Sequence, residues 1–376
     1  MLLITRLSTG GAERVALELT RRLVAGGHEM HVATVYSGGD LRDQAAAAAC
    51  QLHDGLAVNR FDLRCIWRMR KLIRRHGIDA LLIVDATRAN LLCGVYGALL
   101  AGRRCGRVLW MHNCPTGSND LRMPGFLPRL KRMVPLLHRL VPVGEWLGRL
   151  LISEGLPAGK IEPIPNGIDL HRYRLDISQA RARAELDLPD RGRLVIQVGN
   201  RWPTREPRWL LEAFAAAGVP DAGLVLVGQG TDAPDVAAAA RELGLEGRVF
   251  LRGPTTEVPL YLRACDVFAL ASTYETHSLG VLEALAAGLP VIVPDIPAFQ
   301  AGIDHGENAL KHDPAEPAEL AEALGRVLSE PGLAGRLAEA GQRTVQHYSA
   351  EAMARRFEDL LSVYGPAAGG EGEPGR

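Results

Sequence analysis

Short apolar runs alternate with longer helical patterns along most of the chain, and this alternation constrains the fold more than any other feature. Several of the runs are apolar at every position, which is typical of parallel strands buried on both faces. Repeated strand–helix–strand order predicts parallel sheets covered by helices. The predicted strands are 1–7, 30–36, 79–86, 107–113 and 139–144 in the first half, and 193–199, 222–228, 248–253, 266–272 and 290–295 in the second.

The pattern occurs twice, with an irregular connection at about 166–192 between the two series. We therefore predict an α/β fold of two doubly wound, Rossmann-like domains, 1–170 and 171–349, facing each other across a cleft. A helix at about 350–364 is expected to pack back on the first domain. The Gly-, Pro- and Glu-rich tail, 365–376, is expected to be disordered. Ligands of such sheets bind at the carboxyl ends of the strands.

The chain of 376 residues has equal numbers of basic and acidic side chains, which argues against a dedicated nucleic-acid binder. The halves differ, however. Residues 1–170 carry 23 Lys and Arg against 14 Asp and Glu, and the remainder carries 20 against 29. Two stretches of the basic half, 64–77 and 128–139, interleave basic with apolar residues as amphipathic helices do. They are either ordinary solvated faces or contacts to an anionic membrane surface.

The cysteines and the apolar segments give no sign of secretion or membrane insertion. None of the six cysteines forms a Cys-x-x-Cys pair or another zinc-ligand spacing, and we find no signal peptide. No uncharged apolar run reaches the roughly 18 residues of a membrane-spanning helix. We expect a cytoplasmic protein with reduced thiols, either free in the cytoplasm or bound peripherally to the inner face of the membrane.

Three strand-to-helix turns of the second half contain residues suited to a diphosphate. The turns are "VGNRWPTREP" (198–207), "LVGQG" (226–230) and "STYETHSLG" (272–280). They bring together Arg201, Arg205, several glycines and a helix that begins near Ser278. Backbone N–H groups at a helix N-terminus bind anions, and Arg gives bidentate contacts. Each turn alone is ordinary turn chemistry, but the three together favour a site.

The third turn leads into an apolar helix that carries a single carboxylate, Glu283. A buried carboxylate needs a partner, which either the protein or a ligand supplies. Glu275 precedes the helix and is expected to point toward the cleft. In the first half, Gly10 and Gly11 permit close approach of a ligand. His112 ends an apolar strand, where a histidine is either structural or catalytic.

In this order, these motifs resemble the family 4 retaining glycosyltransferases of GT-B fold, also described as glycosyl transferases group 1. The resemblance spans nearly the whole chain, and the pair Glu275-x7-Glu283 is its most specific element. The other stretches that carry it are "GGAERVALELTRRLVAGGHEMHV" (10–32), "PIPNGIDLHRY" (163–173), "VGNRWPTREPRWLLEAF" (198–214), "LVGQG" (226–230), the segment 249–293 and "GENALKHDPAEPAELAEAL" (306–324).

The resemblance implies transfer of a sugar from a UDP- or GDP-sugar to an acceptor hydroxyl, with the anomeric configuration retained. By that analogy Glu275 contacts the donor sugar and Glu283 the ribose. Arg201 and Arg205 hold the diphosphate, and His112 lies against the sugar. The further positions that the resemblance assigns to donor or acceptor binding are Gly10, Gly11, Asn166, Gly199, Gly228, Ser278, Leu279 and Gly280.

No metal or other cofactor is expected, because GT-B enzymes of this type generally need none and the chain has no Asp-x-Asp. The sequence departs from the family in one turn. Asn200 stands where the family usually has Arg, Arg201 is one place later, and Arg205 replaces the usual Lys. A shift of one residue on an extended segment turns a side chain to the other face.

The expected function is therefore that of a hexosyltransferase in polysaccharide, glycolipid or other glycoconjugate synthesis. The expected partners are a nucleotide-sugar donor and a sugar or lipid-linked acceptor. Two alternatives remain: a nucleotide-sugar 2-epimerase of the same architecture, and a non-catalytic protein that binds a nucleotide or a partner enzyme.

Overall fold

The structure is a computed structural model that describes residues 1–102, 104–113 and 126–365. Most of the predicted tail, from residue 366 on, and Cys114 lie outside these residues. The chain divides into two compact units. The first comprises Met1–Gly167 and the segment from Ala350 on, and the second comprises Ile168–Ser349.

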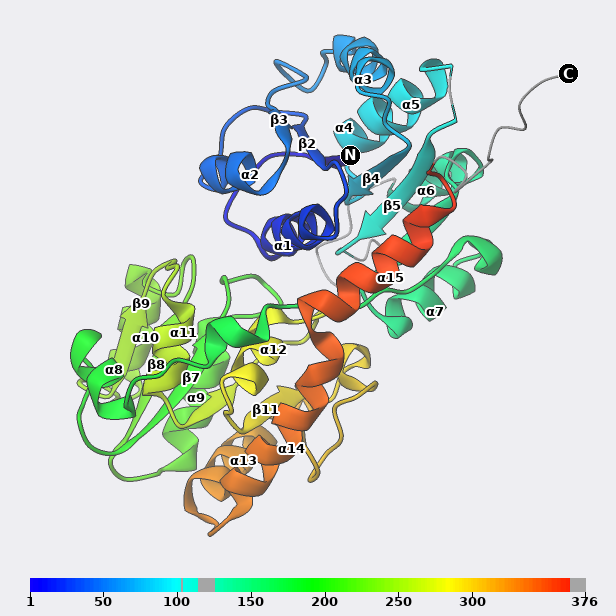
Figure 1. The fold of residues 1–376 in the computed structure, drawn as a ribbon. Helices are drawn as coiled ribbons and strands as arrows, with labels where there is room; N and C mark the ends of the chain where they lie inside the picture. Colours follow the sequence, from blue (N-terminus) through cyan, green and yellow to red (C-terminus); the bar gives the residue numbers. More distant parts are fainter. Residues whose placement is uncertain (103, 114–125, 366–376) are drawn as a thin grey trace, which may run out of the picture. The chain divides into compact units, whose positions relative to one another are not determined.

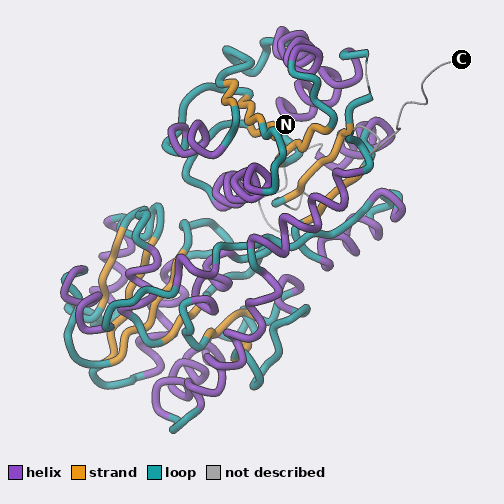
Figure 2. Tube along the Cα trace, viewed as in Figure 1, coloured by secondary structure: helices purple, strands orange, loops and turns teal. Residues whose placement is uncertain are grey.

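The first unit contains a six-stranded sheet in the order β3-β2-β1-β4-β5-β6, and every pairing is parallel (Figures 1 and 2). Leu3 pairs with Ala33 on one side and Ile83 on the other, so the first strand lies in the middle of the sheet. This is the Rossmann strand order, in which the direction of winding reverses between β1 and β4. The strands are β1 (Leu2–Ile4), β2 (His31–Thr34), β3 (Gln51–His53), β4 (Ala80–Val84), β5 (Gly106–Met111) and β6 (Arg139–Pro142).

The helices described in the first unit are α1 (Gly11–Ala25), α2 (Arg42–Ala48), α3 (Arg64–Arg75), α4 (Arg88–Leu91), α5 (Gly97–Leu100), α6 (Phe126–Met133), α7 (Glu145–Ser153) and α15 (Ala350–Ser362). They lie between these strands, except for α7, which follows β6, and α15, which follows the second unit. The amphipathic helix predicted at 128–139 is only partly correct. It ends at Met133, and a short 3-10 turn that contains Pro135 follows, two residues before β6. Proline lacks the N–H that an α-helix would use there.

The second unit repeats the architecture with the sheet order β12-β11-β10-β7-β8-β9, again parallel throughout. When the strands are numbered from the start of each unit, both sheets have the order 3-2-1-4-5-6. The strands are β7 (Arg193–Val198), β8 (Ala222–Val227), β9 (Val249–Arg252), β10 (Val267–Ala269), β11 (Val291–Pro294) and β12 (Leu310–His312). The helices are α8 (Gln179–Glu185), α9 (Pro207–Ala217), α10 (Pro234–Glu242), α11 (Val258–Ala264), α12 (Leu279–Ala286), α13 (Pro317–Ser329) and α14 (Leu333–Thr344).

The strands of the second sheet are buried on both faces. Ile196 and Val225 belong to the core on one side of the sheet, and Val195 and Leu224 to the core on the other. Burial of alternate residues in opposite cores explains why β8 and the middle of β7 are apolar at successive positions. All ten strands predicted from apolar runs are present, which confirms the α/β fold with two doubly wound sheets.

Helix α15 belongs to the first unit although the chain reaches it only after completing the second (red in Figure 1). The ring of Phe357 packs edge-on against Trp110 of β5, with ring centroids 4.8 Å apart. Arg22 of α1 forms an ion pair with Glu351 at 2.7 Å. Within the described ranges, no helix is both long enough and apolar enough to cross a bilayer.

Candidate functional site

Three turns meet where the winding of the second sheet reverses. Strands β10, β7 and β8 are neighbours in the sheet, so the turns that follow their carboxyl ends lie side by side. The reversal is between β7 and β10, the position at which doubly wound sheets bind ligands. The structure thus brings together the three turns that sequence analysis singled out.

Two glycines let the first two turns approach closely. The backbone φ of Gly199 is +152° and that of Gly228 is +147°, a region that L-residues with side chains rarely adopt. A Cβ atom on Gly228 would collide with the carbonyl oxygen of Gly199. The N–H of Gln229 donates to the side-chain oxygen of Asn200 at 3.0 Å, so Asn200 ties the first turn to the second.

Arg205 and Glu275 pair with each other across the reversal point. The Nε of Arg205 donates to Oε1 of Glu275 at 3.0 Å, and Nη2 donates to the same oxygen. Both side chains are largely buried, with 17% of Arg205 and 6% of Glu275 exposed. Neither residue belongs to α12, so the pair joins two loops that extend from different strands.

Arg201 lies in a different network. Its guanidinium contacts Glu206 at 2.9 Å and Asp235 at 2.7 Å, and it is bidentate to both carboxylates. Hydrogen bonds to Asp235 and Glu206 raise the pKa of Arg201 above its ordinary value. Two acidic side chains already balance the charge of Arg201, and its contact with Asp235 ties the turn after β7 to α10.

Glu283 is buried on α12 and has a partner within the protein. The hydroxyl of Tyr173 donates to Oε1 of Glu283 at 2.8 Å. Tyr173 belongs to a short 3-10 helix, Leu170–Tyr173, that packs on α12. The partner is a side-chain hydroxyl from 110 residues away, and nothing near Glu283 in the sequence indicates it.

The N-terminus of α12 has no side-chain cap. The N-cap is Ser278, as predicted, and its side chain makes no capping hydrogen bond. Gly280 packs so closely that a Cβ would lie 2.7 Å from the carbonyl oxygen of Val198, at the end of β7. Uncapped N–H groups of Ser278, Leu279 and Gly280 at the reversal point form a favourable environment for an anion.

His277, immediately before this N-cap, is a residue that sequence analysis missed. Its Nδ1 is buried and has no hydrogen-bond partner among the described residues. Burial lowers the pKa of His277 to about 4, so the imidazole is neutral at pH 7. A buried polar atom without a partner is uncommon and points to a ligand or water at that position.

In the first unit, Gly10 is the N-cap of α1 and Gly11 its first residue. The Glu13 carboxylate lies over Gly10, where a Cβ atom would collide with it. Ser8 donates to Glu13 at 3.2 Å. Burial raises the pKa of Glu13. The Gly-Gly turn therefore faces a carboxylate of its own helix, which the sequence did not suggest.

The neighbouring strand end carries a second such carboxylate, Asp85, directly after β4. It has a positive φ of 57°. Its two oxygens accept the backbone N–H of His112 and the side-chain amide of Asn113, both at 2.9 Å. Burial raises the pKa of Asp85 to about 6. Non-glycine residues with positive φ gather at functional sites.

His112 itself is buried at the end of β5, with its ring 4.5 Å from that of Trp110. The fold thus places His112 beside Asp85 at the carboxyl edge of the first sheet. Asn166 is also buried, and its Oδ1 has no hydrogen-bond partner in the described part of the chain.

Each half of the chain matches the profile of a known protein family. Residues 9–172 match the profile described as Glycosyltransferase Family 4, and residues 178–344 match Glycosyl transferases group 1. N-acetyl-alpha-D-glucosaminyl L-malate synthase of Bacillus anthracis is 24% identical over 368 residues, covering 94% of each chain. D-inositol 3-phosphate glycosyltransferase of Salinispora tropica is 33% identical over 227 residues, covering 55% of this chain and 46% of the relative.

A second D-inositol 3-phosphate glycosyltransferase, from Nocardia farcinica, is 34% identical over 250 residues, which are 63% of this chain and 54% of the relative. These matches thus span about half the length of both D-inositol 3-phosphate glycosyltransferases.

Solved structures show the same fold. HepE of Anabaena, crystallised with UDP and glucose, superposes with a TM-score of 0.81 and 19% identity, covering 96% of this chain and all of HepE. Sucrose-phosphate synthase of Thermosynechococcus elongatus gives 0.80 and 21%, covering 96% and 98%. With two profiles that together span most of the sequence, and with the sheets of GT-B structures, the chain belongs to the family 4 glycosyltransferases of GT-B fold.

Proposed function

We propose that this chain is a retaining hexosyltransferase that moves a sugar from a nucleotide-sugar donor to an acceptor hydroxyl. The donor binds the second unit at the turns after β7, β8 and β10. The observation that carries the proposal is the pairing of Arg205 with Glu275 at the reversal point, beside the uncapped N-terminus of α12.

The chemistry requires stabilisation of a leaving diphosphate. As the bond between sugar and phosphate breaks, negative charge grows on the diphosphate and positive charge on the sugar ring. Arg205 and the N–H groups at 278–280 are fixed donors for the first charge. Such donors each lower the barrier by roughly 3–4 kcal/mol in known enzymes.

Glu275 then acts on the sugar. Since Arg205 holds one carboxylate oxygen of Glu275, binding of the diphosphate to Arg205 also fixes the position of Glu275. Glu283, which Tyr173 orients through a hydrogen bond, accepts from the ribose hydroxyls. In this proposal the leaving phosphate takes the proton of the acceptor hydroxyl on the face where the new bond forms.

The acceptor binds at the carboxyl edge of the first sheet. Asp85 and His112 are the groups there that can accept or donate hydrogen bonds to hydroxyl groups. Burial raises the pKa of Asp85 to about 6, which suits a group that holds the acceptor hydroxyl through hydrogen bonds. Gly10 and Gly11 lie at the start of α1, beside the Glu13 carboxylate, and we propose that this turn faces the ligand.

The names of related proteins favour a uridine nucleotide. HepE was crystallised with UDP-glucose. A relative from Escherichia coli that is 34% identical over 143 residues is named as a UDP-Gal galactosyltransferase. We therefore propose a UDP-sugar as the donor and a hydroxyl of a sugar or glycoconjugate as the acceptor.

A thermal-shift screen of UDP-, GDP-, ADP- and TDP-sugars tests the donor. A ligand that binds only the native state raises Tm by an amount that grows with its concentration relative to Kd. We expect UDP-sugars to give the largest shift and the Arg205→Ala variant to lose it. Product analysis by NMR, with and without acceptor, then tests for transfer with retention. Formation of a 2-epimer without acceptor would contradict the proposal.

We also propose that the first unit contacts an anionic membrane surface. Of the exposed large apolar side chains, seven fall within residues 58–100, on α3, α5 and the segments beside them. They are Val58, Phe61, Leu63, Trp67, Tyr96, Leu99 and Leu100. Helix α3 packs on α5, and Arg70 donates to the carbonyl oxygen of Leu100 at 2.8 Å, so basic and apolar groups share one surface. That combination is typical of helices that lie in the membrane interface.

A further inference from the structure

Three histidines from separate elements of the first unit converge on one point. His31 is the first residue of β2, His53 the last of β3, and His76 follows the end of α3. One ring nitrogen from each lies within 4.8 Å of the other two. Nδ1 of His31 lies 3.0 Å from Nε2 of His53. The ring centroids of His31 and His76 are 4.7 Å apart.

The distance between His31 and His53 is close to that between two ligands of a tetrahedral metal ion. Bonds of about 2.0–2.1 Å between zinc and imidazole nitrogen place neighbouring nitrogens roughly 3.3 Å apart. The His31–His53 distance already has this value to within a few tenths of an ångström. Since His53 and His76 are only partly buried, their rings have room to rotate until all three nitrogens reach this separation.

A carboxylate orients the buried histidine of the three. Nε2 of His31 lies 3.1 Å from Oε1 of Glu29, and only 2% of the His31 side chain is exposed. If Nε2 donates its proton to Glu29, the lone pair of Nδ1 points at the other two histidines. Metal-binding histidines almost always have such a partner on the second ring nitrogen.

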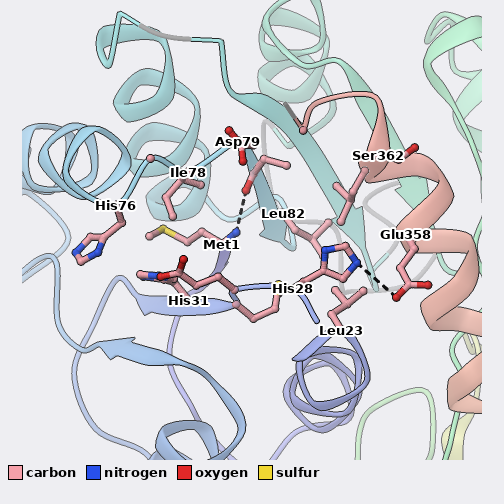
Figure 3. A pocket seen from close by; sticks show the side chains of 16 residues that line it. Met1, Leu23, His28, His31, His76, Ile78, Asp79, Leu82, Glu358 and Ser362 are labelled. Carbon is pink, nitrogen blue, oxygen red and sulfur yellow. Dashed lines mark hydrogen bonds and ion pairs between the residues drawn. The ribbon is translucent and has the colours of Figure 1, made fainter. Parts of the chain in front are cut away.

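We propose that His31, His53 and His76 bind one transition-metal ion of the zinc, nickel or cobalt class, with Glu29 as the residue that orients His31. Three neutral imidazoles suit these ions, and a water molecule completes the tetrahedron. His31 and His76 also line a cavity of about 320 Å³, which gives water a route to the fourth position (Figure 3).

The proposed ion serves structure and not transfer. The three histidines belong to β2, β3 and the end of α3, whereas Asp85 and His112 follow β4 and β5 on the other side of the strand order. The ion would join the edge strand β3, its neighbour β2 and the end of α3. It would thereby cross-link the two ends of the segment between residues 31 and 76. Sugar transfer is expected to proceed at the same rate with and without it.

Metal titration of the full chain without a histidine tag tests the proposal. We expect one Zn²⁺ per chain by calorimetry and by elemental analysis after dialysis. Tm should rise by about 5 °C in roughly hundredfold excess over Kd. Bound Co²⁺ should give the visible spectrum of a four-coordinate ion without a thiolate charge-transfer band.

Single-residue variants test whether these histidines are the metal ligands. His53→Gln and His76→Gln remove single ligands at partly exposed positions, and each should weaken Zn²⁺ binding at least tenfold. Glu29→Gln should weaken it about tenfold. His28→Gln is the matched control, because His28 lies beside the same cavity but pairs with Glu358. Circular dichroism and Tm without metal check that each variant is folded.

Two outcomes would overturn the site. One is a wild-type chain that retains no Zn²⁺, Ni²⁺ or Co²⁺ at a tenfold excess over protein. The other is equal binding by the wild-type chain and by a folded variant that lacks both His53 and His76. Since neither outcome depends on a donor or an acceptor, failure here leaves the proposed transfer activity unaffected.

Discussion

The guanidinium of Arg205 donates two hydrogen bonds to one oxygen of Glu275, and this pair links the strand end of β7 to that of β10. A diphosphate at Arg205 would thus contact the residue that holds Glu275. Donor binding and placement of the sugar-contacting carboxylate are coupled through this contact.

Replacing Arg205 by Ala should damage both stability and turnover. Glu275 would remain buried without a cation, which costs about 3 kcal/mol of unfolding free energy. Loss of a donor to the leaving diphosphate should lower kcat by about 10²–10³. Urea unfolding and the rate of UDP release measure the two effects. Glu275→Ala on the same background should recover part of the stability but none of the activity. Near-wild-type turnover in both single variants would refute the assignment.

Arg201→Gln should behave differently. Arg201 pairs with Glu206 and Asp235, so its loss should cost about 1 kcal/mol of stability. The Kd for the donor should change by less than about threefold, and a change of that size corresponds to only a small part of the free energy of donor binding. Calorimetric titration with the donor distinguishes a residue that only holds its turn from one that binds the diphosphate. A loss of donor affinity as large as that of Arg205→Ala would show that Arg201 binds the diphosphate.

Tyr173→Phe should raise the KM for the donor more than it lowers kcat. The substitution removes the hydrogen bond that orients Glu283, an interaction with a charged group worth about 1.5–3 kcal/mol. Steady-state kinetics at varied donor concentration separates the two parameters. Tyr261→Phe, at a buried tyrosine of the same core, is the matched control and should leave KM unchanged. An unchanged KM in Tyr173→Phe would argue against the ribose contact.

Stability should fall as the pH falls from about 6.5 to about 4, in part through His277. Burial lowers the pKa of His277 to about 4 in the folded state, whereas an unfolded histidine titrates near 6.5. Between these values the unfolded state binds the proton first, so acid favours unfolding. His277→Phe should lose less stability than the wild type between pH 7 and pH 4.5. His171→Phe, at an exposed position, serves as control. Equal slopes in the wild type and His277→Phe would contradict the expectation.

The surface that includes α3 and α5 should bind acidic vesicles in a salt-dependent manner. Trp67 is 59% exposed and Phe61 68%, and a guanidinium lies over each ring, that of Arg70 over Trp67 and that of Arg60 over Phe61. Co-sedimentation should require anionic lipid and should weaken as salt screens the charges. The double variant Trp67→Ala and Phe61→Ala should lose binding, whereas Trp209→Ala, an exposed tryptophan of α9, should retain it. No binding at low salt would exclude the contact.

The sequence predicted the fold more fully than the site, for a physical reason. Runs such as 222–228 are apolar throughout because both faces of the strand are buried, and this leaves a clear pattern. The strands Gln51–His53 and Leu310–His312 were missed, because each has three residues, lies at a sheet edge and carries polar side chains.

Site residues depend on contacts that a local pattern does not record. The glycine turns and the helix that begins after Ser278 could be found, because turn and cap chemistry is local. The Tyr173–Glu283 contact joins residues 110 apart. The positive φ of Asp85 and the unpaired Nδ1 of His277 are properties of the folded chain alone.

The position of α15 has a consequence for synthesis on the ribosome. The first unit needs Phe357 against Trp110 to complete its packing, yet the whole second unit is translated in between. The second unit can therefore fold as soon as it emerges, whereas the first, although it begins earlier, finishes later. Until α15 emerges, the apolar surface beside Trp110 is exposed to chaperones and to other nascent chains.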